Sequence, residues 1–161
     1  MRYLKVVLVL VFLAVVGVGA VAGFALAEGG TTDATKWEWA RGIFLKERSP
    51  GAIGKPGADA DLRLTVTDFS CTPRGVSETC IAKVDVRSAS EDETELKADL
   101  QYLHLDDIVV AATEVTPSEK VASGDQEKEI VWREVPSGGV RQIELHEGLL
   151  SGGILIKLRS E

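Results

Sequence analysis

The sequence contains few of the residues that usually form metal centres. Its 161 residues include two cysteines, Cys71 and Cys80, and two histidines, His104 and His146. Both histidines are far from the cysteine pair along the chain, so the four residues are a poor match to the spacing of a zinc site. We therefore expect neither a bound metal nor a cofactor.

Basic residues are also scarce, with 18 Lys and Arg against 25 Asp and Glu. Residues 1–27 contain two of the basic residues and none of the acidic ones, so the remaining 134 residues carry a formal charge of −9. Nucleic-acid binding requires a basic face. The charge balance therefore argues against a nucleic-acid partner and against strong attraction to anionic lipid.

Apolar residues, in contrast, are concentrated at the N-terminus. Val6 to Ala27 is a run of 22 residues without a charge, preceded by Arg2 and Lys5. As a helix it would be about 33 Å long, enough to cross the hydrocarbon core of a membrane. An uncleaved anchor is favoured by this length, whereas a signal peptide is favoured by the small-x-small site Ala25-Leu26-Ala27. Both interpretations place the rest of the chain outside the cytoplasm, because the basic residues stay inside.

Residues 28–58 read as a connector that ends in a Pro/Gly-rich hinge, with the domain boundary near Ala58. The middle of this connector contains Trp37, Trp39 and Phe44. Aromatic residues just outside a membrane span are typical of the membrane–water interface. These residues are therefore candidates for a membrane interface, and the other interpretation is that the tryptophans pack onto the domain.

Cys71 and Cys80 form an even, closely spaced pair in a part of the chain that we expect to be exported. In an oxidising compartment such a pair indicates one disulfide. In the chain-entropy model, closing a loop of this size stabilises a fold by about 2.5–3 kcal/mol.

Residues 59–161 show the period-two alternation of half-buried strands. The expected strands are 61–70, 80–87, 96–102, 108–112, 130–135, 141–146 and 153–158, and residues 116–129 are expected to be mostly exposed loop. About seven short strands without a convincing long helix predict an all-β domain, most consistent with an immunoglobulin-like β-sandwich.

The last third of the chain resembles a known family. Val135-Pro136-Ser137-Gly138-Gly139, Ile143-Glu144-Leu145-His146 and Ser151-Gly152-Gly153-Ile154 are similar to the ending of a Gram-positive exported domain family, and upstream matches extend the likeness over residues 53–158. This family has no assigned function and includes relatives of a secreted immunoprotective antigen of actinobacteria. The resemblance implies an immunoglobulin-like fold. Some members carry a telomere-repeat-binding label, which an acidic, exported chain does not support.

Three groups of residues invite a catalytic interpretation: His104 with Asp106 and Asp107, His146 with Glu144 and Glu147, and Ser151. A nucleophile needs a base within hydrogen-bond reach and a third group that orients this base. The sequence contains no nucleophile-elbow pattern, so we expect no catalytic residue. We predict a non-catalytic extracytoplasmic module that binds an envelope protein or a cell-wall component. The alternatives are a cell-envelope hydrolase and a secreted structural or antigenic protein without a dedicated ligand.

Overall fold

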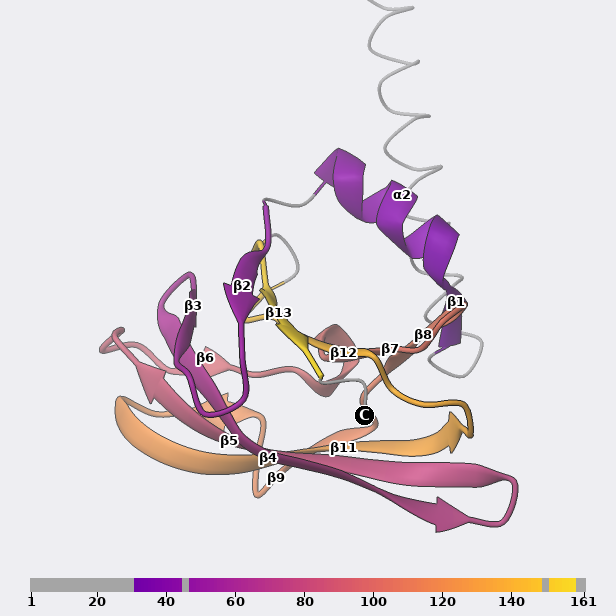
Figure 1. The fold of residues 1–161 in the computed structure, drawn as a ribbon. Coiled ribbons are helices and arrows are strands. Elements are labelled where there is room, and N and C mark those ends of the chain that lie inside the picture. The colour runs from indigo at the N-terminus through magenta and orange to yellow at the C-terminus, as the bar shows by residue number, and fades with distance from the viewer. Residues whose placement is uncertain (1–30, 45–46, 149–150, 159–161) are drawn as a thin grey trace, which may run out of the picture.

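Two β-sheets pack face to face in this protein (Figure 1). The computed structural model describes residues 31–44, 47–148 and 151–158. One sheet has six strands in the order β1-β8-β7-β12-β13-β2. They span Thr31–Asp33, Ile108–Ala111, Tyr102–His104, Gln142–Leu145, Ile154–Lys157 and Ser49–Gly51, respectively. The expected all-β sandwich is confirmed.

The second sheet has five strands in the order β3-β4-β5-β11-β9. They span Gly57–Asp59, Leu62–Arg74, Ser77–Ser88, Gly124–Pro136 and Glu114–Thr116. A two-stranded ribbon joins β6 (Thr94–Glu95) to β10 (Lys120–Val121), and the helical elements are α2 (Ala34–Phe44) and the 3-10 turn η1 (Ala98–Leu100). Neighbouring strands run antiparallel, except that β2 lies parallel to β13.

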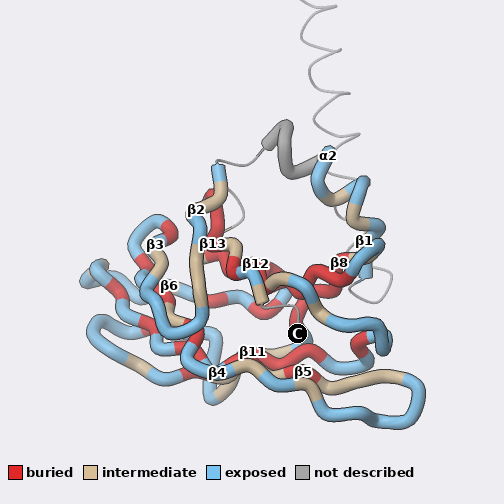
Figure 2. The backbone as a smooth tube through the Cα atoms, viewed as in Figure 1, coloured by how far each residue is buried: buried red, intermediate tan, exposed pale blue. Residues whose placement is uncertain are grey.

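A single hydrophobic core lies between the two main sheets, where buried residues concentrate (Figure 2). Every second residue along a strand faces this core, so Leu64 and Val84 from one sheet belong to the same buried cluster as Ile143 and Ile156 from the other. Trp132 is the largest fully buried side chain, and its indole N–H donates a hydrogen bond of 3.2 Å to the backbone carbonyl of Gln101. Apolar burial therefore supplies the main stabilisation of the fold.

The longest hairpin is formed by β4 and β5, which confirms the strands expected at 61–70 and 80–87 and extends both. Their two-residue turn has Gly75 at φ +70°, the left-handed region in which glycine carries no steric penalty. The register shifts once, between Val66 and Asp68. Such a bulge increases the local twist of a strand.

Residues 96–102 do not form the expected continuous strand. The segment contains η1 instead, although Leu96, Ala98 and Leu100 are buried and Lys97 and Asp99 are exposed, as the alternation predicted. The backbone N–H groups here find partners outside a sheet ladder; that of Leu96, for example, donates to the carbonyl of Glu119. Alternation therefore predicted the burial of Leu96, Ala98 and Leu100, but it predicted neither the break in strand pairing nor the complete burial of Gln101.

The prediction of an exposed loop at 116–129 was also wrong for its second half. Residues 124–129 form the first part of β11, paired with β5. Lys128 lies on the core-facing side of this strand and is buried. Its Nζ donates hydrogen bonds to the backbone carbonyls of Ser118 and Lys120, both at 2.7 Å. Burial lowers the pKa of Lys128. A high charge content therefore concealed a strand.

The structured domain begins earlier than the boundary expected near Ala58. Strands β1 and β2 lie at the two edges of the six-stranded sheet, and β3 lies at one edge of the five-stranded sheet. β1 and β2 belong to the segment expected to be a connector, and β3 crosses its end. Each pairs over only three residues, too short for a period-two pattern to be visible in the sequence.

Helix α2 lies against the six-stranded sheet, on the side facing away from the core (Figure 1). None of the helices in the described ranges is long and apolar enough to cross a membrane. The apolar segment 6–27, with its two interpretations, lies outside the described residues.

Candidate functional site

A buried carboxylate lies beneath helix α2, on the outer face of the six-stranded sheet. Ile143 and Leu145 of β12 face the core, so Glu144 between them faces the opposite side, where it is completely buried. Burial of a carboxylate is costly unless charged or hydrogen-bonding partners surround it. The partners of Glu144 therefore define the candidate site, which we call the Glu144 cluster: Glu144, His104, His146, Arg48 and Trp37.

Both histidines of the chain contact this one carboxylate. Nε2 of His104 lies 2.6 Å from Oε2 of Glu144, and Nε2 of His146 lies 2.8 Å from Oε1. An ionised carboxylate can only accept hydrogen bonds, so Nε2 is the protonated, donating nitrogen of each imidazole. This fixes the orientation of both rings.

Arg48 neutralises the buried carboxylate. Its Nη2 and Nε donate to the two oxygens of Glu144 at 2.9 and 3.2 Å, and Nη2 also donates to Glu38 at 2.7 Å. Burial opposes the charge of Arg48, but its hydrogen bonds and ion pairs with Glu38 and Glu144 outweigh burial and raise its pKa. Arg48 thereby joins the segment between α2 and β2 to the middle of the sheet.

Aromatic rings close the cluster on the side of the helix. Trp37 of α2 donates from Nε1 to Oε2 of Glu144 at 3.4 Å, and its ring centroid lies 4.3 Å from that of Tyr102. Tyr102 also meets His146 edge-to-face at 5.9 Å. Burial, followed by the nearby charges of Asp99 and Glu144, raises the pKa of the Tyr102 hydroxyl.

Ser151 approaches the second ring nitrogen of His146. The distance from Ser151 Oγ to Nδ1 is 3.4 Å, but the same hydroxyl donates a shorter bond of 2.8 Å to the carbonyl of Gly148. Gly153 lies directly against the imidazole, and a Cβ atom there would come within 2.5 Å of it. The serine therefore closes its own turn beside a tightly packed ring.

Two further carboxylates hold the end of this loop to β3 and β4. Asp59 accepts hydrogen bonds from the backbone N–H groups of Glu147 and Gly153 at 2.8 and 3.0 Å. Glu147 in return accepts from the N–H groups of Asp61 and Leu62 at 2.6 and 2.9 Å. Desolvation by burial raises the pKa of Glu147.

The structure gathers only some of the residues singled out from the sequence. His104, Glu144, His146 and Ser151 lie together, whereas Asp106 instead pairs with Arg141 at 3.0 Å. No sequence pattern indicated Arg48 or Trp37 as partners of Glu144, because they are 96 and 107 residues away. The sequence did contain one signal of a buried polar cluster: Glu144 is a charged residue between the apolar residues Ile143 and Leu145.

The proposed membrane-interface residues differ in their surroundings. Trp37 packs onto the sheet through Tyr102, as the second interpretation held, whereas Trp39 is 59% exposed. Phe44 ends helix α2, and its side chain lies outside the described residues.

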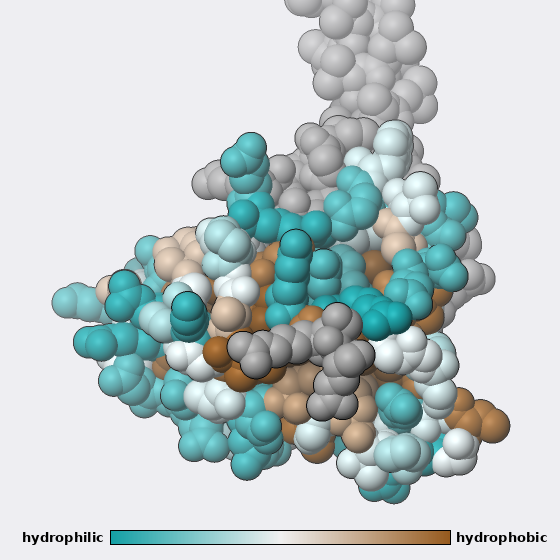
Figure 3. All heavy atoms as spheres, in the orientation of Figure 1, coloured by the Kyte–Doolittle hydropathy of each residue, from teal (hydrophilic) through white to brown (hydrophobic). Residues whose placement is uncertain are grey.

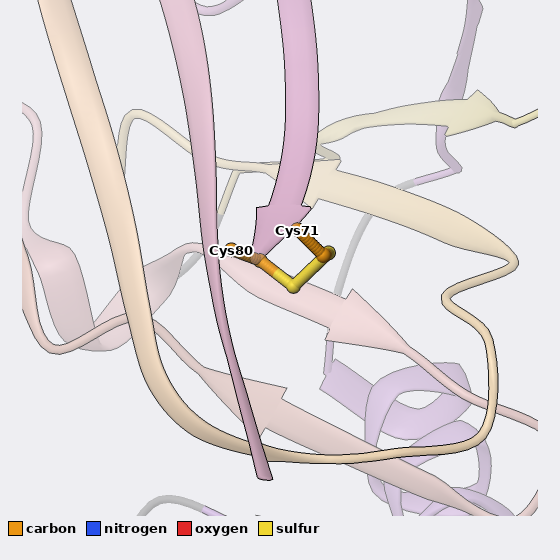
Figure 4. The surroundings of a disulfide bond; sticks show 2 residues. All are labelled: Cys71 and Cys80. Carbon is orange, nitrogen blue, oxygen red and sulfur yellow. A yellow bond between two sulfur atoms is a disulfide. The ribbon is translucent and has the colours of Figure 1, made fainter. Parts of the chain in front are cut away.

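The expected disulfide is present between Cys71 and Cys80, which lie directly opposite each other on β4 and β5 (Figure 4). Cys71, Cys80 and Glu78 form, within the described residues, the one group of three His, Cys, Asp or Glu whose ligand atoms all lie within 4.8 Å of one another. The two histidines of the Glu144 cluster instead contact the carboxylate directly, and the three residues do not form such a group.

A shallow hollow of about 480 Å³ lies on the outer face of the five-stranded sheet. Its side chains come from β4, β5 and β11: Arg63, Thr65, Asp85, Val86, Arg87, Asp125, Gln126 and Glu127. Arg87 and Asp125 form an exposed ion pair at 3.6 Å. The mixed charges are typical of the solvated face of a sandwich and select no ligand class.

Comparison with known proteins gives no relative: no family model, no curated protein and no solved structure matches this chain.

Proposed function

We propose that this protein is a non-catalytic interaction module that acts outside the cytoplasm and binds an envelope protein or a cell-wall component. The apolar segment 6–27 holds it at the membrane or is removed during export. The resemblance to a Gram-positive exported family with an immunoglobulin-like fold supports this proposal, as do the acidic charge and the disulfide.

The proposal rests mainly on the Glu144 cluster, in which the buried carboxylate already has its hydrogen-bond partners within the protein. Glu144 and His146 are 0% and 2% exposed, and both oxygens of the carboxylate are occupied by side chains of the protein. A catalytic base must reach the proton that it removes from a substrate. The cluster is therefore better suited to hold α2 and residue 48 on the sheet than to process a ligand.

The most suitable contact surface is the hairpin arm, defined as residues 68–83 of β4, β5 and their turn. Beyond residues 62–64, where it pairs with β3, the outer edge of β4 carries no further strand pairing in the described part of the chain. Residues 72–76 at the end of the arm are all exposed (Figure 2), and Val76 is 95% exposed. The disulfide crosses the arm and restrains it, which lowers the entropy cost of binding.

Trp39 supplies the proposed contact with the membrane surface. On the face of the molecule shown in Figure 3, hydrophilic side chains predominate at the periphery. The Trp39 side chain is 59% exposed, so its indole is available to the interfacial region when the chain is anchored. The mass of the protein recovered from membrane and medium would test this step: a full-length species in the membrane supports it, and a species beginning at Glu28 in the medium contradicts it.

Photo-cross-linking tests the interaction itself. A benzophenone side chain is placed at Val76 in the full chain, in the cells that naturally produce it, and a matched protein carries it at Glu91, in the turn at the other end of β5. We expect a discrete adduct from position 76 and none from position 91. No adduct from position 76 would favour a structural or antigenic protein without a ligand.

The hydrolase alternative rests on the Ser151–His146–Glu144 chain of contacts. A fluorophosphonate probe labels serines that a base has activated. We expect no labelling of Ser151, because its hydroxyl donates to Gly148. Labelling that disappears in both Ser151→Ala and His146→Gln would overturn the non-catalytic proposal.

A further inference from the structure

The core-facing side of the hairpin arm carries a carboxylate, that of Glu78, that has no hydrogen-bond or ion-pair partner among the described residues. Glu78 lies two residues before Cys80 on β5, so both side chains are on the same, core-facing side of the strand. Cys80 is fully buried and Glu78 is half-buried. Within the described residues, the side-chain carboxylate of Glu78 forms no hydrogen bond and no ion pair, unlike those of Glu38, Glu114, Glu144 and Glu147.

The neighbours of Glu78 are the two sulfur atoms. Cys71 faces Cys80 across the strand pair, and a carboxylate oxygen of Glu78 and both Sγ atoms lie within 4.8 Å of one another. Two thiolates and a carboxylate are a ligand set that Zn²⁺ accepts, with a fourth tetrahedral position left for water. The sequence alone could not show this set, because the spacing of Cys71, Glu78 and Cys80 matches no zinc motif.

We propose that the arm binds one Zn²⁺ ion through Cys71, Cys80 and Glu78 when the disulfide is reduced, and releases it when the disulfide forms. Reduction by a dithiol transfers two electrons and two protons to the S–S bond and leaves the reductant as a disulfide. Zinc then replaces the two thiol protons, which are released to solvent. Oxidation by a second disulfide, which accepts the two electrons and takes two protons from solvent to become a dithiol, restores the S–S bond and frees the ion.

The antiparallel register makes this exchange compatible with the fold. Tetrahedral zinc with Zn–S bonds of about 2.3 Å separates its two sulfurs by about 3.8 Å. The Cα atoms of Cys71 and Cys80 are 4.0 Å apart, so rotation about the χ1 angles of the two reduced cysteines changes the distance between their sulfurs while the residues stay opposite each other on β4 and β5. In each redox state, one link therefore joins β4 to β5 at the same pair of residues.

The test uses the full chain, freed of metal and either oxidised or reduced with a phosphine. Zn²⁺ binding is measured by competition with a chromophoric chelator, and Cd²⁺ substitution reports thiolate ligation through its ultraviolet charge-transfer absorption. We expect one Zn²⁺ per reduced chain and none per oxidised chain. Loss of a ligand's supporting hydrogen bond already costs about 10- to 100-fold in metal affinity, so Glu78→Gln should weaken binding at least about tenfold. Glu91→Gln, in an exposed turn, should leave it unchanged.

Folding is measured in parallel by circular dichroism and by thermal unfolding. Zn²⁺ should raise the Tm of the reduced protein and leave that of the oxidised protein unchanged. Equal affinity of the wild type and Glu78→Gln would overturn the proposal, and so would a reduced chain that stays unfolded with Zn²⁺ or that binds none. Glu78→Gln retains its disulfide when oxidised, so its fold is verified in that state.

Discussion

Glu144 is the residue whose replacement should disturb the fold most directly. Glu144→Ala would leave Arg48, His104 and His146 without their shared acceptor, and breaking a buried ion pair in this way costs about 3–5 kcal/mol. We expect a loss of this size in the free energy of unfolding, measured by urea denaturation. Glu38→Ala removes only the exposed partner of Arg48 and should cost less than about 1 kcal/mol. Similar losses for the two variants would show that the cluster contributes little.

Gly153 tests how tightly the His146 ring is packed. Gly153→Ala would place a methyl group 2.5 Å from the imidazole at φ +79°. Gly75 also has a positive φ, +70°, but a Cβ atom added there would have no other atom within 4 Å, so Gly75→Ala isolates the backbone penalty of about 1–2 kcal/mol. We expect Gly153→Ala to cost at least about 1 kcal/mol more than Gly75→Ala in thermal unfolding. Equal costs would mean that the loop moves away from the ring freely.

At the scale of elements, the β4–β5 hairpin depends on its disulfide. The double variant Cys71→Ala/Cys80→Ala removes the cross-link and should lower the free energy of unfolding by about 2.5–3 kcal/mol. Urea denaturation of the oxidised wild type and of the variant measures this difference. In the wild type, thiol titration should detect no free thiol until a reductant is added. Two reactive thiols in unreduced protein would contradict the bridge.

The loop that follows β12 should give the fold a pH dependence through Glu147. Burial raises the pKa of this carboxyl in the folded state above its ordinary value of about 4.3. The folded protein therefore binds the proton more tightly, so the stabilisation is complete below the unfolded pKa and is lost as the pH rises through the folded pKa. We expect the stability of the wild type relative to Glu147→Gln to be greater at pH 4 than at pH 7. Urea denaturation at both values checks the sign, and a difference that grows with pH would contradict it.

Alternation predicted those elements whose side chains separate cleanly into two faces. The strands β4 and β5 were located in this way, because one face of each meets the apolar core, whereas β8 was predicted from a short apolar run. The method failed at 96–102, where buried and exposed residues alternate along a segment that contains η1. It also failed at 124–129, where the carbonyls around Lys128 make a charged residue compatible with the inner face of β11.

At the scale of the whole molecule, the β-sandwich could be predicted from the sequence, but the Glu144 cluster and the N-terminal elements that pack on the sandwich could not. His104, His146 and Ser151 could be singled out because few residue types carry such chemistry. The contact of His104 with Glu144 depends on strand order, since β7 and β12 are neighbours although 40 residues separate these two side chains. Arg48 directly precedes residues 49–57, a stretch rich in Pro and Gly that has the composition of a hinge. Composition alone cannot distinguish a hinge from a segment held by its backbone and one ion pair.

The partners of Glu144 also determine where the folded unit begins. A chain that starts at Asp59 follows the boundary expected from the sequence, but it lacks β1, α2 and β2 and the partners Arg48 and Trp37. It would expose Tyr102, Val109 and Ala111 and leave the Glu144 carboxylate buried without its cation. A chain that starts at Glu28 keeps all of these contacts. We expect the longer chain to unfold cooperatively in urea and to show slow amide exchange in β7 and β12, and the shorter chain to lose the cooperative transition. A shorter chain with the same transition midpoint would show that the N-terminal elements are dispensable and that the boundary near Ala58 was correct.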